Sequence, residues 1–210
     1  MADGSETTIF VVEDDAAVRD SLQLLLRLRG FAARGFASAD EFLAEVGPNQ
    51  GGCLLLDLRM PGKGGLELQA ELLDRGLRLP VVVITAHGDV AAARAAFRAG
   101  AIDFLEKPLD EDALLSAIRA ALDRDRQRRR SERMHADVEE RIARLTARER
   151  DVMWLAADGR KNREIAAALG LSPRTVEIYK AHMMEKLQVN GLPELLALLR
   201  DAKPGPGGAP

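Results

Sequence analysis

Acidic residues follow two short apolar runs in the N-terminal half of the chain. Glu13 and Asp14 come directly after the run TIFVV, and Asp57 ends the run CLLLD just before a Met-Pro-Gly turn. Three carboxylates brought within a few ångström would repel one another strongly unless a divalent cation lay among them. Ligands that are all oxygen atoms favour magnesium. Beside such an ion the Asp57 carboxylate could act as a nucleophile toward phosphorus, because the metal neutralises the incoming phosphoryl oxygens.

Two further polar residues follow apolar runs in the same half of the chain. Thr85 ends the run LPVVVIT, and Lys107 stands between the run AIDFLE and Pro108. The Lys107 ammonium could neutralise phosphoryl oxygens, and the Thr85 hydroxyl could donate a hydrogen bond to one of them. Each residue alone has an ordinary explanation, such as helix capping by Asp57 or a surface charge at Lys107. Their joint occurrence at predicted strand ends favours phosphoryl chemistry, and the sequence leaves open whether the Lys107–Pro108 bond is cis.

Apolar runs that alternate with segments of helical period must position these residues. The runs are TIFVVE, AARGF, CLLLD, LPVVVIT and AIDFLE. This alternation predicts β-α units that form a parallel sheet covered on both faces. In a doubly wound sheet of strand order 2-1-3-4-5, the first and third strands are neighbours and ligands bind beyond the carboxyl ends. We therefore predict an α/β fold with a flavodoxin-like, five-stranded parallel sheet that brings Glu13 and Asp14 beside Asp57.

Local signals agree with alternating strands and helices. Ser38 to Glu41 form a capping box that opens the second helix, and Gly30, Gly76 and Gly100 fall where helices should end. Two helices carry apolar residues at helical spacing. The first apolar face is predicted to contain Val18, Leu22, Leu25 and Leu26, and the second Leu66, Leu68, Leu72 and Leu73.

Composition and charge limit the classes of protein that fit. No apolar run approaches the roughly 20 residues that span a bilayer, and the polar start MADGSETT lacks a signal-peptide pattern, so we expect a cytoplasmic protein with no membrane partner. The single cysteine, Cys53, has no partner for an internal disulfide or a thiolate metal cluster. Residues 1–124 hold 13 Lys/Arg against 20 Asp/Glu, whereas residues 125–210 hold 17 against 13. This asymmetry favours a polyanion partner for the C-terminal half, with a random scatter of surface charge as the alternative.

The C-terminal half shows only helical periods. Residues 124–144 are densely charged and predict a helical linker that continues the fifth helix, either pairing with a second copy or serving as a solvated connector. Thr146 to Glu149 form a capping box that opens another helix. The end of the chain, KPGPGGAP, cannot pack and is expected to be disordered.

The segment KNREIAAALGLSPRTVEIYKAHMMEKL predicts two helices joined by a tight turn at Gly170-Leu171-Ser172. Ser172 is the expected N-cap and Pro173 the first helical residue, and small alanines allow the close crossing of a helix-turn-helix. A further helix is predicted at 192–200. A purely structural helical hairpin is the alternative, but the basic residues favour contact with duplex phosphates. These residues are Lys161, Arg163, Arg174, Lys180 and Lys186.

Taken together, the N-terminal residues resemble a known family. The set Glu13-Asp14, LDLRMPG, Thr85-Ala86 and Lys107-Pro108 is similar to the receiver domain of bacterial two-component response regulators over about residues 7–124. The resemblance implies that Asp57 accepts a phosphoryl group from a sensor histidine kinase. It implies that Mg²⁺ is held by Asp14, Asp57, the backbone carbonyl of Arg59, and Glu13 through water. It also implies that Thr85 and Phe104 form a switch pair, although Glu13 replaces the commoner Asp and Phe104 lacks the hydroxyl of the frequent Tyr.

The C-terminal segment resembles the LuxR-type DNA-binding domain over about residues 144–203, through the pattern E-I-A-x-x-L-x-x-S-x-x-T-V. The resemblance assigns base-edge contacts to Glu177, Ile178 and Ala181. Some family members carry Lys at positions 177 and 181, so the operator sequence does not transfer. The residues expected nearer the DNA backbone are Lys161, Asn162, Arg163, Arg174, Thr175, Lys180 and His182.

Joined in this order, the two segments resemble the NarL/FixJ-like group, and His87-Gly88-Asp89 favours its FixJ-like branch. The predicted domains are a phosphoacceptor receiver at 7–124, a charged helical linker at 125–143, a four-helix helix-turn-helix domain at 144–203 and a disordered tail at 204–210. The expected function is a transcriptional regulator, not an enzyme, that is phosphorylated on Asp57, forms a homodimer, binds promoter double-stranded DNA and acts with RNA polymerase.

Two alternatives remain at this point. One is a magnesium-dependent phosphohydrolase that works through an aspartyl phosphate, but Arg59 stands where such an enzyme needs an acid two residues after the nucleophile. The other is a receiver that controls an RNA- or protein-binding module, since RNA differs from duplex DNA in its 2′-hydroxyl and groove shape.

Overall fold

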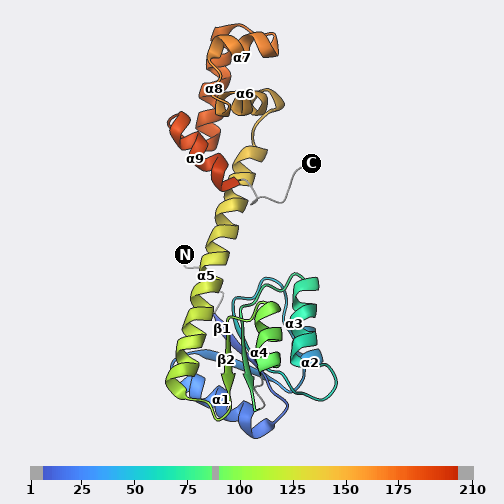
Figure 1. The fold of residues 1–210 in the computed structure, drawn as a ribbon. Coiled ribbons are helices and arrows are strands. Elements are labelled where there is room, and N and C mark those ends of the chain that lie inside the picture. Colours follow the sequence, from blue (N-terminus) through green and yellow to red (C-terminus); the bar gives the residue numbers. More distant parts are fainter. Residues whose placement is uncertain (1–6, 87–89, 203–210) are drawn as a thin grey trace. The chain divides into compact units, whose positions relative to one another are not determined.

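The computed structural model describes residues 7–86 and 90–202 (Figure 1). The chain forms two compact units, Met1–Arg128 and Arg129–Pro210. The predicted disordered tail at 204–210 and the His87-Gly88-Asp89 segment lie outside the described residues. In the part of the chain that the structure describes, no helix is both long enough and apolar enough to cross a membrane.

The described part of the N-terminal unit contains a five-stranded parallel sheet. Its strands are β1 (Thr8–Val12), β2 (Ala32–Phe36), β3 (Gly52–Asp57), β4 (Val81–Thr85) and β5 (Asp103–Glu106), in the order β2-β1-β3-β4-β5. Val12 lies opposite Leu56 of β3, and Asp57 lies opposite Ile84 of β4. The predicted fold class and strand order are confirmed, and the carboxyl ends of β1 and β3 adjoin.

Helices cover both faces of this sheet (Figure 1). Leu54 and Leu55 are successive strand residues, so their side chains enter opposite cores. Leu55 packs with buried residues of α1 and α5, whereas Leu54 packs with those of α2, α3 and α4. The helices are α1 (Ala16–Leu28), α2 (Ala39–Glu45), α3 (Gly65–Asp74), α4 (Val90–Arg98) and α5 (Glu111–Ala143). The apolar face predicted for α1 is confirmed, because Leu22 and Leu26 are buried in this core and Val18 and Leu25 pack against it.

The apolar face predicted for α3 is wrong at two of its four leucines. Leu68 and Leu72 are buried, but Leu66 is 36% and Leu73 is 65% exposed. At 3.6 residues per turn, positions seven apart have nearly the same direction, so Leu66 and Leu73 share a side that is turned away from Leu68. Gln69 completes the buried face instead.

Side-chain caps begin the helices where the sequence predicts them. Ser38 Oγ accepts the Glu41 N–H at 3.2 Å. The Glu41 carboxylate accepts the N–H of Ala37 at 2.6 Å, one residue before the donor that a capping box uses. The box at Thr146 and Glu149 has both of its bonds, at 3.3 and 2.8 Å.

Helix α5 continues without a break through the charged segment, from Glu111 to Ala143. The C-terminal unit then adds α6 (Ala147–Ala157), α7 (Asn162–Leu169), α8 (Pro173–Leu187) and α9 (Leu192–Ala202). Ser172 caps α8, and Gly170 ends α7 in the left-handed conformation, as the tight turn predicts. These helices share a core that includes Val152, Ile165, Val176, Met183 and Leu187.

The amino end of β3 is anchored to α5. The Gly52 N–H donates to Asp125 Oδ2 at 3.0 Å, and Asp125 is 2% exposed. Gly52 has a φ of +138°, and a Cβ at this position would lie 1.8 Å from the Thr8 carbonyl oxygen. The strand that ends in Asp57 therefore requires glycine at its start.

Candidate functional site

The carboxylates of Glu13, Asp14 and Asp57 meet at the adjoining carboxyl ends of β1 and β3. One oxygen from each lies within 4.8 Å of the others. Glu13 is 1% and Asp57 6% exposed, whereas Asp14 is open to solvent. The donors are all oxygen atoms and one side of the cluster is accessible to water, so these residues fit a hard divalent cation that keeps part of its hydration shell.

Lys107 brings a positive charge into this cluster from the end of β5. Its Nζ donates to Glu13 Oε2 at 2.6 Å and to Asp57 Oδ2 at 3.0 Å. Its backbone N–H donates to the Thr85 carbonyl at 2.8 Å, which extends the pairing of β4 with β5, and the following peptide bond to Pro108 is cis. The ammonium is thereby held between the two buried carboxylates.

Burial and neighbouring charges together shift the pKa values in the cluster. Burial is the largest cause that raises the pKa of Glu13 above its ordinary 4.5, and the Asp57 and Asp14 charges add to it, while Lys107 opposes it. Burial alone would lower the pKa of Lys107, but its bonds to Glu13 and Asp57 outweigh burial and raise that pKa above the ordinary 10.5. Lys107 is therefore charged at neutral pH.

The loop that carries Glu13 and Asp14 is fixed by two residues that sequence reasoning did not single out. Arg19 Nη1 donates to the backbone carbonyl of Glu13 at 2.7 Å and to that of Asp14 at 3.3 Å. Asp15 Oδ1 accepts the N–H groups of Ala17 and Val18 at 2.8 and 3.1 Å, which begins α1. The N-cap role of Asp15 could be predicted from its residue type. The role of Arg19 could not, because a single arginine in a helix has no sequence pattern that indicates its partner.

The remaining predicted residues of the receiver site lie at or near the same edge of the sheet. Thr85 is fully buried at the end of β4. Phe104 lies on β5 opposite Val83 and packs, partly buried, against the core under α2, α3 and α4. The Arg59 N–H donates to Asp57 Oδ1 at 3.2 Å, so the loop after β3 folds back toward the acid. The roles of Thr85 and Phe104 as a switch and of the Arg59 carbonyl as a ligand stay predictions.

In the C-terminal unit, α8 presents the predicted base-contacting residues to solvent. Glu177, Ile178 and Ala181 are exposed, and Ile178 is 50% exposed although it is apolar. Lys180 Nζ donates to Asn162 Oδ1 at 3.1 Å, which joins α8 to the start of α7. Of the other predicted contacts, Lys161, Arg163, Arg174 and His182 are exposed, and Asn162, Thr175 and Lys180 are partly buried.

Comparison with known proteins identifies both units. The model of the response regulator receiver domain matches residues 9–119, and that of the luxR family of bacterial regulatory proteins matches residues 143–199. The chain is 45% identical to the transcriptional regulatory protein FixJ of Azorhizobium caulinodans over 204 residues, which cover 96% of this chain and 97% of that protein. This chain belongs to the response regulator family.

Solved structures of response regulators agree with this assignment. The structure of the response regulator StyR has a TM-score of 0.86 and 42% identity, with 93% of this chain and 98% of that chain covered. The full-length FixJ from B. japonicum has a TM-score of 0.57 and 40% identity, with 94% and 97% covered. The expected receiver and LuxR-type domains are thus both confirmed as the parts of this response regulator.

Lys186, one of the basic residues expected to face DNA phosphates, is paired with an acid in this response regulator. Lys186 Nζ donates to both carboxylate oxygens of Glu149, at 2.9 and 2.7 Å. Glu149 is 3% exposed and also accepts the Thr146 N–H. Lys186 therefore neutralises a buried acid and ties α8 to α6, a role that its charge alone did not distinguish from phosphate binding.

The Glu149–Lys186 pair should make the response regulator's C-terminal unit sensitive to acid. Burial raises the pKa of Glu149, but the hydrogen bonds from Lys186 and Thr146 outweigh it and hold that pKa below the ordinary 4.5. A lowered pKa contributes stability that is present above pH 4.5 and is lost as the pH falls through the folded-state value. Glu149→Gln should lower the free energy of unfolding by about 1–3 kcal/mol at pH 7, and the difference from wild type should shrink as the pH falls below 4.5.

Urea unfolding followed by fluorescence tests this, because the single tryptophan is Trp154, within α6. Glu185→Gln is the matched control, since Glu185 is an exposed acid on α8. An equal loss of stability at pH 7 and pH 3 in Glu149→Gln would contradict the electrostatic explanation.

Proposed function

We propose that this chain is a phosphorylation-gated transcriptional regulator whose Asp57 accepts a phosphoryl group from a sensor histidine kinase. The observation that carries the proposal is the buried Asp57 carboxylate, held 3.0 Å from Lys107 Nζ beside Glu13 and Asp14, on a chain that also has a LuxR-type domain. A carboxylate at a rigid strand end with a neutralising ammonium is suited to phosphoryl transfer.

The proposed reaction uses groups that the cluster already holds. An Asp57 oxygen attacks phosphorus, the bond from phosphorus to the kinase histidine nitrogen breaks, and that nitrogen keeps the electron pair. Asp14, Asp57, the Arg59 carbonyl and, through water, Glu13 would hold Mg²⁺, which when bound would neutralise charge on the phosphoryl oxygens. Lys107 Nζ, 3.0 Å from Asp57 Oδ2, would pair with one phosphoryl oxygen, and the Thr85 hydroxyl would donate to another.

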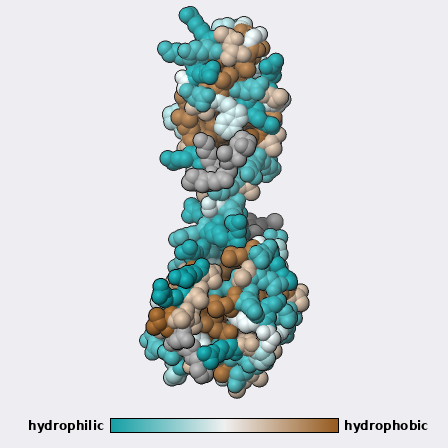
Figure 2. All heavy atoms as spheres, turned by 45° about the vertical axis from the view of Figure 1, so that its right-hand side comes forward, coloured by the Kyte–Doolittle hydropathy of each residue, from teal (hydrophilic) through white to brown (hydrophobic). Residues whose placement is uncertain are grey.

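The switch would run from Thr85 to the face formed by α4 and β5. As Thr85 moves toward the phosphoryl group, it leaves space next to Phe104 on the neighbouring strand, and this face repacks to favour a homodimer. Val90 and Phe97 of α4 are 77% and 50% exposed, so the face offers apolar surface for such a contact. Figure 2 shows apolar patches among polar side chains on the N-terminal unit.

In the C-terminal unit, α8 would enter the major groove. Glu177, Ile178 and Ala181 would contact base edges, and the seven surrounding residues named above would contact the DNA backbone. A dimer would place two such helices at half-sites about 10 base pairs apart. We further propose that the DNA-bound protein acts with RNA polymerase in the cytoplasm, with domain limits at 7–124, 125–143 and 144–203.

Metal removal tests this proposal directly. The full chain, with duplex DNA chosen by selection, should bind about 5–150-fold more tightly after treatment with a small phosphodonor and Mg²⁺, because allosteric coupling usually amounts to about 1–3 kcal/mol. The same treatment in EDTA should give no increase in DNA affinity. Without Mg²⁺, the negative charges of the clustered carboxylates repel the phosphodonor. An increase that is as large in EDTA would contradict a metal-dependent acceptor, and tighter binding to single-stranded RNA would contradict the DNA target.

A further inference from the structure

One side chain of α1 holds both peptide groups that flank Asp14. Arg19 Nη1 donates to the Glu13 carbonyl oxygen at 2.7 Å and to the Asp14 carbonyl oxygen at 3.3 Å. These carbonyls belong to the peptide groups before and after the Asp14 Cα, so the two bonds restrict both backbone torsions of Asp14. The bonds of Arg19 thus set the direction in which the Asp14 side chain leaves the backbone.

Asp14 is the carboxylate of the cluster with the least support from other side chains. Glu13 and Asp57 are buried, and both accept a hydrogen bond from Lys107 Nζ. The Glu13 N–H also donates to the Phe36 carbonyl at 3.1 Å. Asp14 is exposed, and its carboxylate has no hydrogen bond to the described residues. The position of this carboxylate relative to the other two therefore depends on the backbone of its loop.

Gly35 on β2 leaves the space through which the Arg19 side chain reaches this loop. A Cβ at Gly35 would lie 2.9 Å from Arg19 Cγ and 2.4 Å from Gln23 Nε2. The Gln23 amide is the end of a flexible side chain and can move away. Cγ lies in the middle of the Arg19 side chain, so displacing it would also shift the guanidinium. The φ of Gly35 is not in the left-handed region, so glycine is needed here for space rather than for conformation.

We propose that Arg19 is a positioning residue for the metal site and that Gly35 keeps its path open. This inference rests on the proposed function, in which Asp14 holds Mg²⁺. Arg19 acts on the affinity for Mg²⁺ in two opposite ways. Its charge repels the ion, whereas the fixed direction of Asp14 favours binding because the ligand is already ordered when the ion arrives. The positioning effect is the larger of the two.

Titration of the full chain with Mg²⁺, followed by NMR through the backbone amide signals of Asp14 and Asp57, tests this inference. Arg19→Gln should raise the Kd for Mg²⁺ by about tenfold, the lower end of the range for groups that orient a metal ligand. Loss of the charge alone would lower the Kd, so the direction of the change separates positioning from electrostatic repulsion. Gly35→Ala leaves every charge in place and should raise the Kd as well.

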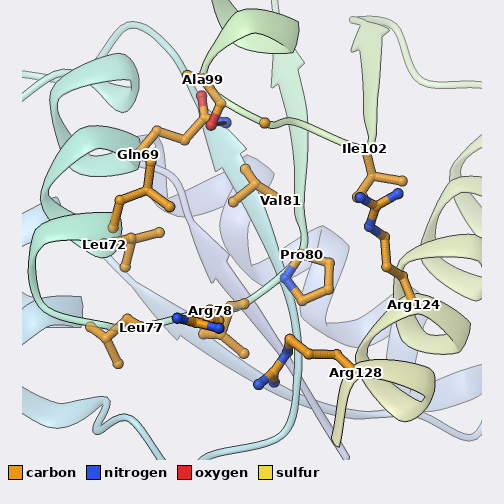
Figure 3. Close-up of a pocket in the computed structure, with 13 residues that line it drawn as sticks. Gln69, Leu72, Leu77, Arg78, Pro80, Val81, Ala99, Ile102, Arg124 and Arg128 are labelled. Atoms are coloured by element: carbon orange, nitrogen blue, oxygen red, sulfur yellow. Dashed lines mark hydrogen bonds between the residues drawn. The ribbon is translucent and has the colours of Figure 1, made fainter. Parts of the chain in front are cut away.

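Two other arginines serve as matched controls. Arg27→Gln removes an exposed arginine of the same helix, which donates to the Ala33 carbonyl of β2 at 3.3 Å instead of to the loop. Arg124→Gln removes an exposed arginine of α5, which lines a pocket of about 550 Å³ at the opposite edge of the sheet, where β4 begins (Figure 3). Both variants should bind Mg²⁺ with a Kd close to that of the wild type.

An unchanged or lower Kd in Arg19→Gln, or an unchanged Kd in Gly35→Ala, overturns the inference. Circular dichroism checks that each variant is folded, and Gly35→Ala decides the question if Arg19→Gln is not. A wild type that binds no Mg²⁺ at Asp14 and Asp57 would overturn the metal-dependent proposed function together with this inference. That result differs from a wild-type site that binds Mg²⁺ equally well without Arg19, which would overturn this inference alone.

Discussion

Asp57→Asn should abolish the increase in DNA affinity that a phosphodonor produces in the wild type. The amide has nearly the size of the carboxylate and can still accept from Lys107, so the fold should be kept. It lacks the anionic oxygen that attacks phosphorus, and no phosphoryl group would be attached to drive the switch. A wild-type increase of about 5–150-fold should therefore fall to none, measured as the Kd for selected duplex DNA with and without donor and Mg²⁺.

The control for this experiment is Asp74→Asn, which removes an exposed carboxylate at the end of α3. It should keep the whole increase. If Asp57→Asn responded to the donor as strongly as the control does, Asp57 would not be the acceptor, and the geometry of the cluster would need another explanation.

Gly52→Ala should be the most destabilising small substitution in the receiver unit. A Cβ at Gly52 would lie 1.8 Å from the Thr8 carbonyl oxygen, and the φ of +138° is one that alanine rarely adopts. Overpacking and backbone strain each cost about 1–3 kcal/mol, so a loss of about 3–5 kcal/mol is expected. That loss is a large fraction of a typical domain's stability.

Two spectroscopic signals, tryptophan fluorescence and circular dichroism, show which unit Gly52→Ala destabilises. The single tryptophan and the single tyrosine are Trp154 and Tyr179, both in the C-terminal unit, while circular dichroism reports helices of both units. The variant should lower the urea midpoint of a circular dichroism transition and leave that of Trp154 fluorescence unchanged. Gly47→Ala should be close to neutral, because a Cβ there meets nothing within 4 Å. Equal midpoints for the two variants would refute the steric argument.

Much of the receiver could be predicted because strand ends are marked in the sequence. The apolar runs of β1, β3, β4 and β5 each stop at a polar residue, and parallel topology then brings Glu13 and Asp14 to Asp57. The direction of a side chain around a short helix is harder to predict. Helical spacing groups Leu66 and Leu73 with Leu68 and Leu72 on one apolar face, but the structure turns Leu66 and Leu73 to solvent. Hydrophobicity alone does not give the phase of a helix rich in leucine.

Pairings between distant charges could not be predicted. Lys186 resembled the other basic residues of α8, and only the packing of α6 against α8 shows that it meets Glu149. The bonds from Arg19 to the Glu13 and Asp14 carbonyls, and from Gly52 to Asp125, likewise depend on a backbone path that residue types do not encode. The assignment of the LuxR-type contacts came from resemblance to a family rather than from such geometry.

The two hydrogen bonds of Lys107, to Glu13 and to Asp57, have a consequence for the rate of the proposed phosphoryl transfer. Its ammonium lies beside Asp57 without any donor present, because Glu13 Oε2 accepts from it at 2.6 Å and Asp57 Oδ2 at 3.0 Å. If Asp57 Oδ2 accepts a phosphoryl group, as proposed, the ammonium would keep its bond to Glu13 and would have to shift only its bond to Asp57. For the proposed transfer the cation would therefore be preorganised, and little of the barrier would be spent on bringing it into place.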